Sequence, residues 1–165
     1  MTDRNLLSMR GVICLTLAIM VVGVAVSADA APKLIDSPEA DWPQWRGPLR
    51  DSISGETGLL DSWPAGGPKL LWKITGMGKG WCSPIIAGGK IFIVGDVGSD
   101  LKIFALGLDG SVTWQVTNGK AWKKSFPGGR AACCYSEGKI YHVNGAGQVV
   151  CLDAKDGKKL WSVDI

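Results

Sequence analysis

The sequence predicts an all-β chain built from two copies of a four-stranded unit, and three observations support this fold class. Glycine-containing turns recur along the chain about every ten residues, a spacing typical of short strands in all-β proteins. No stretch after the N-terminal leader carries an apolar stripe with helical spacing. An Asp-Gly pair with a Trp four residues after the Gly occurs twice, as Asp109-Gly110 with Trp114 and as Asp156-Gly157 with Trp161.

The spacing of these elements defines a sequence repeat. The turn glycines Gly110 and Gly157 lie 47 positions apart (157 − 110 = 47), and residues 89–94 match residues 138–143 at an offset of 49 (138 − 89 = 49). A repeat of this length indicates a propeller or a solenoid, in which each unit packs on its neighbours. We expect each Asp-Gly pair to form a two-residue hairpin turn, since glycine tolerates the left-handed backbone that such turns need.

Each copy is expected to contain four short strands. Their predicted ranges are 82–87, 90–95, 101–107 and 111–117 in the first copy, and 131–136, 139–143, 148–152 and 158–164 in the second. Residues 69–74, which include Trp72, match the last strand of a copy without the three strands that precede it. The sequence therefore predicts two complete units and one orphan outer strand.

Two segments resemble a known family. Residues 152–161 (LDAKDGKKLW) resemble the pyrroloquinoline-quinone-like (PQQ-like) β-propeller repeat, in which Ala-Leu-Asp, a glycine turn and a Trp follow one another. Residues 41–48 (DWPQWRGP) look like the entry segment of exported propellers in that superfamily. The resemblance implies an incomplete β-propeller of four-stranded antiparallel blades over residues 69–165, with blades at 78–119 and 125–165.

The repeated residues then have structural roles. We expect Trp114 and Trp161 to be largely buried between neighbouring blades, and Trp72 to occupy the same position on the orphan strand 69–74. Propellers close with about four to eight blades, so further blades are expected in a longer chain of which this is a fragment. Assembly of short chains into a closed ring is the alternative.

The N-terminus has the features of a signal peptide over residues 1–30. Arg4 and Arg10 precede the apolar stretch 11–26, which is shorter than the ~20 residues of a spanning helix. Ala28 and Ala30 form an A-x-A cleavage site, so the sequence predicts an exported protein, periplasmic or extracellular, with no membrane span after cleavage. An uncleaved membrane anchor is the alternative.

Residues 31–68 are rich in Pro, Gly and Trp and are expected to form an extended strap on the body of the protein. The Trp42 and Trp45 side chains are assigned to packing, with a ligand platform as the alternative. The formal net charge of +3 is too small to imply nucleic-acid binding. Arg130, which follows Pro127-Gly128-Gly129, is the best single candidate for anchoring an anion, but a salt bridge at a blade edge is the favoured interpretation of this residue.

The adjacent Cys133 and Cys134 are weak candidates for a cofactor site. Quinoprotein alcohol dehydrogenases carry adjacent cysteines that form a disulfide over the cofactor, followed by a polar loop. In this sequence residues 135–137 lead directly to the next strand, so the loop is missing and we expect two packed thiols. His142 is the only histidine, which excludes a His-rich metal site. A quinone would also need Ca²⁺ and its oxygen ligands.

These observations favour an exported, non-catalytic propeller that acts as a binding or scaffold module for a protein or carbohydrate partner, without a confident cofactor or metal. The alternative is a fragment of a PQQ-dependent quinoprotein dehydrogenase, an alcohol-oxidising enzyme that would use PQQ with Ca²⁺. A gene product without a function of its own is the third interpretation.

Overall fold

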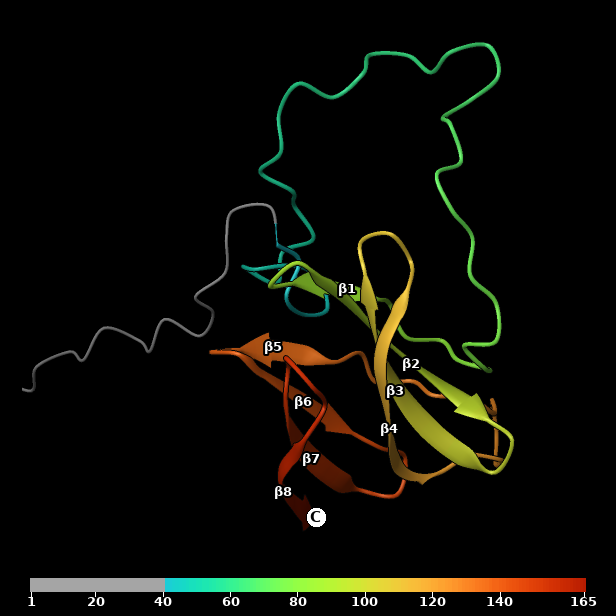
Figure 1. Cartoon of the computed structure of the whole chain (residues 1–165), viewed down its shortest axis with the longest axis vertical. Coiled ribbons are helices and arrows are strands. Elements are labelled where there is room, and N and C mark those ends of the chain that lie inside the picture. Colours follow the sequence, from blue (N-terminus) through green and yellow to red (C-terminus); the bar gives the residue numbers. More distant parts are fainter. Residues whose placement is uncertain (1–40) are drawn as a thin grey trace, which may run out of the picture. The chain divides into compact units, whose positions relative to one another are not determined.

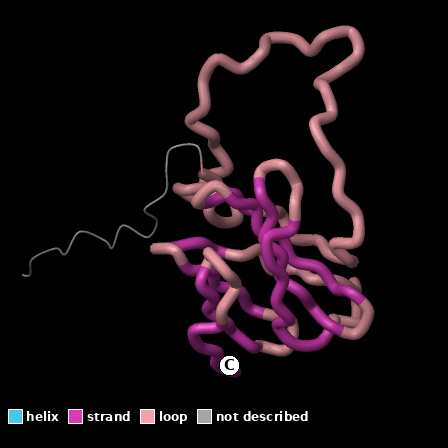
Figure 2. Tube along the Cα trace, in the orientation of Figure 1, coloured by secondary structure: helices cyan, strands magenta, loops and turns pink. Residues whose placement is uncertain are grey.

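The computed structural model describes residues 41–165, all of which belong to one compact unit, Pro32–Ile165. The predicted signal peptide 1–30, its cleavage-site residues Ala28 and Ala30, and the first ten residues of the predicted strap lie outside the described residues. Within 41–165 the chain consists of strands, turns and loops (Figure 2). None of these residues belongs to a helix that is long and apolar enough to cross a bilayer.

The strands form two four-stranded antiparallel sheets, each in sequence order (Figure 1). The first sheet consists of β1 (Ile85–Ala87), β2 (Lys90–Val97), β3 (Asp100–Gly107) and β4 (Val112–Lys120). The second consists of β5 (Cys134–Ser136), β6 (Lys139–Val143), β7 (Gln148–Asp153) and β8 (Lys159–Asp164). The predicted all-β class and the two four-stranded propeller blades are confirmed, and the strand bounds differ from the prediction by a few residues at their ends.

One apolar core joins the two sheets. Ile85, Phe92 and Ile103 of the first sheet and Ile140 and Leu152 of the second are at most 1% exposed and belong to the same buried cluster. They lie on β1, β2, β3, β6 and β7, whereas β8 is exposed along its whole length. Burial of these side chains, each worth about 1.5–3 kcal/mol, stabilises the two blades as a packed pair.

The turns that end the third strands are longer than predicted. Residues 108–111 connect β3 to β4 and residues 154–158 connect β7 to β8, in place of two-residue hairpin turns. The carboxylates of Asp109 and Asp156 accept hydrogen bonds from the backbone N–H two residues later, which closes a local turn without a tight hairpin. Gly110 and Gly157 do have the predicted left-handed backbone, with φ of +82° and +75°.

The start of the strap pairs with the innermost strands of both blades. Trp42 exchanges two backbone hydrogen bonds with Ile86 at the edge of β1, and the Pro43 carbonyl accepts a bond from the Tyr135 N–H at the edge of β5. The orphan strand predicted at 69–74 does not form, because no inner strand within 41–165 pairs with these residues.

Candidate functional site

The repeated tryptophans connect successive units by a common contact. The Trp72 indole N–H donates to the Leu108 carbonyl at 2.8 Å, and its ring lies so close to Gly110 that a Cβ there would be 2.6 Å from it. The Trp114 indole N–H donates to the Ala154 carbonyl at 3.2 Å, and a Cβ on Gly157 would be 2.8 Å from its ring. Each Trp therefore docks on the glycine turn of the following unit, which explains why that turn position must lack a side chain.

The prediction that Trp161 is largely buried is wrong for this structure, in which the side chain is 46% exposed. Its equivalent, Trp114, is half-buried because the turn of the second blade covers it. No such turn lies against Trp161 within residues 41–165, and its ring contacts Tyr141 of its own blade at a centroid distance of 6.0 Å. With Val163 it forms an exposed apolar outer face on β8.

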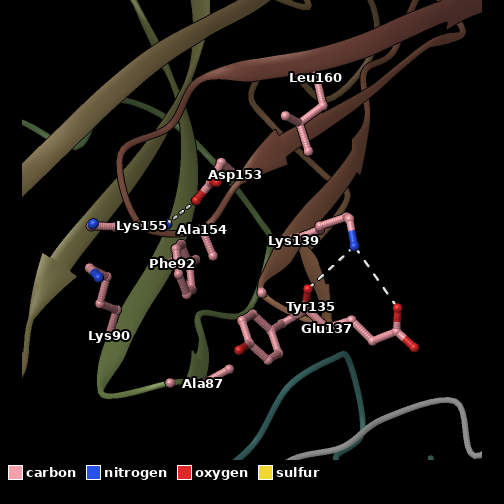
Figure 3. A pocket seen from close by; sticks show the side chains of 12 residues that line it. Ala87, Lys90, Phe92, Tyr135, Glu137, Lys139, Asp153, Ala154, Lys155 and Leu160 are labelled. Carbon is pink, nitrogen blue, oxygen red and sulfur yellow. Dashed lines mark hydrogen bonds and ion pairs between the residues drawn. The ribbon is translucent and has the colours of Figure 1, made fainter.

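A pocket of about 480 Å³ lies between the two blades (Figure 3). Its walls include Lys90 of β2, Tyr135 of β5 and Lys155 of the β7–β8 loop. The Lys139 side chain in the same pocket lies 3.9 Å from the Glu137 carboxylate. This arrangement suits a small anion, but the lysines are on the surface and surface charges of this kind bind weakly.

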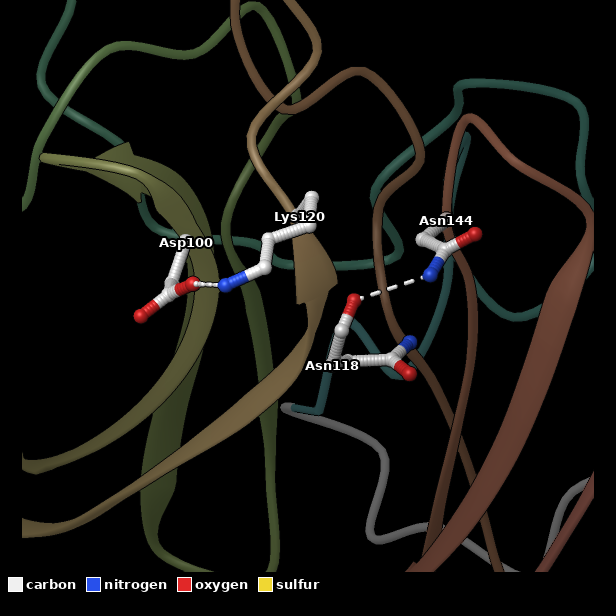
Figure 4. A network of polar contacts seen from close by, with 4 residues as sticks. All are labelled: Asp100, Asn118, Lys120 and Asn144. Atoms are coloured by element: carbon white, nitrogen blue, oxygen red, sulfur yellow. Dashed lines mark hydrogen bonds and ion pairs between the residues drawn. The ribbon is translucent and has the colours of Figure 1, made fainter.

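A polar network fastens the end of β4 to the β6–β7 turn (Figure 4). The Asn144 side chain donates to the Asn118 carbonyl at 2.9 Å, and the Lys120 ammonium lies 2.9 Å from the Asp100 carboxylate. The Asn118 amide nitrogen lies 2.8 Å from His142 Nδ1. Burial lowers the pKa of His142 to about 4, so the ring is neutral at physiological pH and acts as a structural hydrogen-bond partner.

The four cysteines among residues 41–165 are free thiols, and the two adjacent ones differ in burial. Cys133 is 2% exposed in the core, whereas Cys134 is half-buried with its sulfur 3.9 Å from the Gln44 amide oxygen. Burial raises the pKa of both thiols, most strongly that of Cys133. A disulfide ring that presents a face to a quinone does not fit a pair with one sulfur in the core. Within 41–165 no three His, Cys, Asp or Glu side chains cluster as metal ligands.

Arg130 lies in a cavity of about 310 Å³ together with two exposed indoles, Trp45 and Trp81. Sequence reasoning singled out Arg130 but missed Trp81, although a signal was present. Trp81 and Arg130 occupy equivalent repeat positions, since their separation (130 − 81 = 49) equals the offset of the matching segments. The structure brings these positions together, and it places the other sequence candidates, Cys133 and Cys134, outside this set.

The two sheets and the Trp114–Gly157 contact between them define the class of this protein: consecutive four-stranded blades of a repeat β-propeller. A family model described as "Outer membrane protein assembly factor BamB", of the PQQ-like repeat type, matches residues 99–165. That part of the chain therefore matches the PQQ-like repeat, in agreement with the resemblance.

Among solved structures, the chain is similar to one described as "Europium-containing methanol dehydrogenase", with 22% sequence identity and a TM-score of 0.37. The match covers 49% of this chain and 15% of the length of that protein. A comparison with curated proteins gives no match.

Proposed function

We propose that this chain is a non-catalytic binding or scaffold module of an exported PQQ-like repeat propeller. The observation that carries the proposal is the Trp–Gly docking between units, which leaves the equivalent Trp161 face on β8 free for a partner. The assembly factor named by the family model also supports a binding role rather than an enzymatic one.

A further repeat of the same kind is the partner that best fits the outer face of β8. Trp72 and Trp114 both dock on a left-handed glycine turn with a backbone carbonyl as hydrogen-bond acceptor. Trp161 has the same position in its blade, so its ring and N–H are complementary to a third turn of this type. Such a repeat belongs either to a longer form of this chain or to another chain.

The competing proposal is a fragment of a PQQ-dependent dehydrogenase, which only the adjacency of Cys133 and Cys134 favours. These thiols do not fit the quinone, because the sulfur of Cys133 lies in the core. The test is reconstitution of the full chain with PQQ and Ca²⁺, followed by a dye-linked alcohol oxidation assay. We expect no dye reduction above the blank. Turnover that is abolished by Cys134→Ser would overturn the binding proposal and establish the dehydrogenase.

Export is part of the same proposal and rests on Arg4, Arg10, the apolar stretch 11–26 and the A-x-A site at Ala28 and Ala30. Expression of the full chain in a bacterial host should yield periplasmic or secreted material whose N-terminal sequence starts at Ala31. Material that still begins at Met1 and sediments with membranes would contradict export and favour the uncleaved anchor.

A further inference from the structure

Equivalent positions of the two blades meet at the cavity that contains Trp45. Gly80 and Gly129 form a parallel bridge, and the backbone N–H of Trp81 donates to the Gly129 carbonyl at 2.7 Å. The residues that follow these glycines, Trp81 and Arg130, both line the cavity. The bridge holds the segments that precede β1 and β5 together, and this brings Trp81 and Arg130 to one cavity.

Both indoles of the cavity are open to solvent, and that of Trp81 is also held in place. The Trp81 indole N–H donates to the Pro127 carbonyl at 3.1 Å, while 64% of the side chain remains exposed. The Trp45 ring is 63% exposed, with the Arg46 guanidinium 5.5 Å from its centroid. An exposed ring that is already oriented, as at Trp81, offers a flat apolar surface at a low cost in conformational entropy.

Arg130 is oriented by its neighbours but keeps unused donors. Its Nη2 donates to the carbonyls of Ser125 and Phe126, and its guanidinium lies 5.6 Å from the centroid of the Trp122 ring. Nε and Nη1 have no partner among residues 41–165. The blade-edge salt bridge is not formed within that part of the chain, since no carboxylate there lies within ion-pair distance of Arg130. Because Nη2 is already used, each remaining donor can make a single charge-assisted hydrogen bond to a carboxylate oxygen.

We propose that this cavity binds an acidic sugar, a uronic-acid unit of an oligosaccharide. The carboxylate of the sugar pairs with Arg130, and the C–H face of its ring stacks on an indole. The Ser83 hydroxyl and the Trp45 indole N–H, which have no hydrogen-bond partner within residues 41–165, are available to the sugar hydroxyls. A few fixed polar groups on a largely apolar wall are typical of ligand sites.

A sugar fits this cavity better than a flat aromatic acid. The main side chains that line it, Trp45, Trp81 and Arg130, are exposed, so the cavity is open and does not form a closed slot. An open site with two separate indoles and hydroxyl partners suits a thick, hydroxylated ring that extends into a chain. This inference rests on the proposed binding function and specifies its ligand.

The test is isothermal titration calorimetry of the full 165-residue chain with trigalacturonate as the probe. We expect saturable binding, about tenfold weaker for Arg130→Gln and for Trp45→Ala or Trp81→Ala, since loss of a charge-assisted hydrogen bond or a stacked ring is worth about a factor of ten. Arg130→Lys should restore part of the loss. Trp63→Ala is the matched control, because Trp63 is 68% exposed but lies outside the cavity, and it should bind like the parent.

Circular dichroism spectra should be unchanged in all variants, because these side chains are exposed. Absence of binding to trigalacturonate, equal binding to neutral galactotriose, or a Trp63→Ala loss equal to that of Trp81→Ala would each overturn the inference. Tighter binding of pyridine-2,6-dicarboxylate than of trigalacturonate would also overturn it, in favour of a flat aromatic acid. Each of these outcomes would refute the sugar ligand and leave the binding proposal standing. The binding proposal itself would be refuted by PQQ-dependent dye reduction.

Discussion

Truncation of Trp114 to Ala should weaken the contact between the blades more than the same change at Trp161. A fully buried Trp→Ala change costs about 3–5 kcal/mol, and Trp114 is half-buried, which suggests about 2 kcal/mol from packing. Loss of the hydrogen bond to the Ala154 carbonyl adds about 1 kcal/mol. The expected loss in the free energy of unfolding is therefore about 3 kcal/mol.

Trp161→Ala is the matched control, because the residue has the same position in the second blade but no following turn. Its ring is 46% exposed and contacts Tyr141 of its own sheet, so the expected cost is about 1 kcal/mol. Urea unfolding followed by circular dichroism, with m-values compared, measures both variants. Equal losses for Trp114→Ala and Trp161→Ala would refute docking of Trp114 on the second blade.

Three further predictions concern the glycine turn of the second blade, the buried His142 and the outer face of β8. Gly157→Ala should lower the free energy of unfolding, measured in urea, by more than Gly138→Ala. Both glycines have positive φ, so an alanine at either position costs about 1 kcal/mol in backbone strain. Only at Gly157 does the added Cβ also meet the Trp114 ring. Burial lowers the pKa of His142 from about 6.5 to about 4, so protonation favours the unfolded chain. The free energy of unfolding should fall by about 3 kcal/mol as the pH drops from 6.5 to 4, and His142→Gln should remove most of this slope. Trp161→Lys should reduce concentration-dependent association in analytical ultracentrifugation, because the outer face of β8 is apolar and exposed; unchanged association would exclude that face.

The strands were predictable because their signals are local. Residues 139–143 form β6 as expected, since the preceding glycine turn and the alternation of Ile140 with its neighbours act over a few residues. The Asp109 turn was predicted too short, because a side-chain hydrogen bond to the N–H of Ser111 replaces the tight hairpin. That competition depends on side-chain geometry that the spacing of residues does not specify.

The candidate site was only partly predictable. Arg130 was found from its position after a glycine pair, whereas the cavity depends on Trp45, which belongs to the distant entry segment. The repeat offset relates Trp81 to Arg130, but only the bridge between Gly80 and Gly129 shows that the two positions meet. The exposure of Trp161 was missed because the repeat pattern specifies the docking residue and leaves open which turn covers it.

Hydrogen exchange at the indole N–H groups, followed by ¹H–¹⁵N NMR, tests the docking of successive repeat units most directly. The N–H groups of Trp72 and Trp114 donate to backbone carbonyls of the next unit at 2.8 and 3.2 Å, whereas that of Trp161 has no acceptor within residues 41–165. The signals can be assigned from single Trp→Phe variants. Docking of each Trp on the next unit predicts slow exchange at Trp114, intermediate exchange at the more exposed Trp72, and fast exchange at Trp161. Exchange at Trp114 as fast as at Trp161 would contradict it.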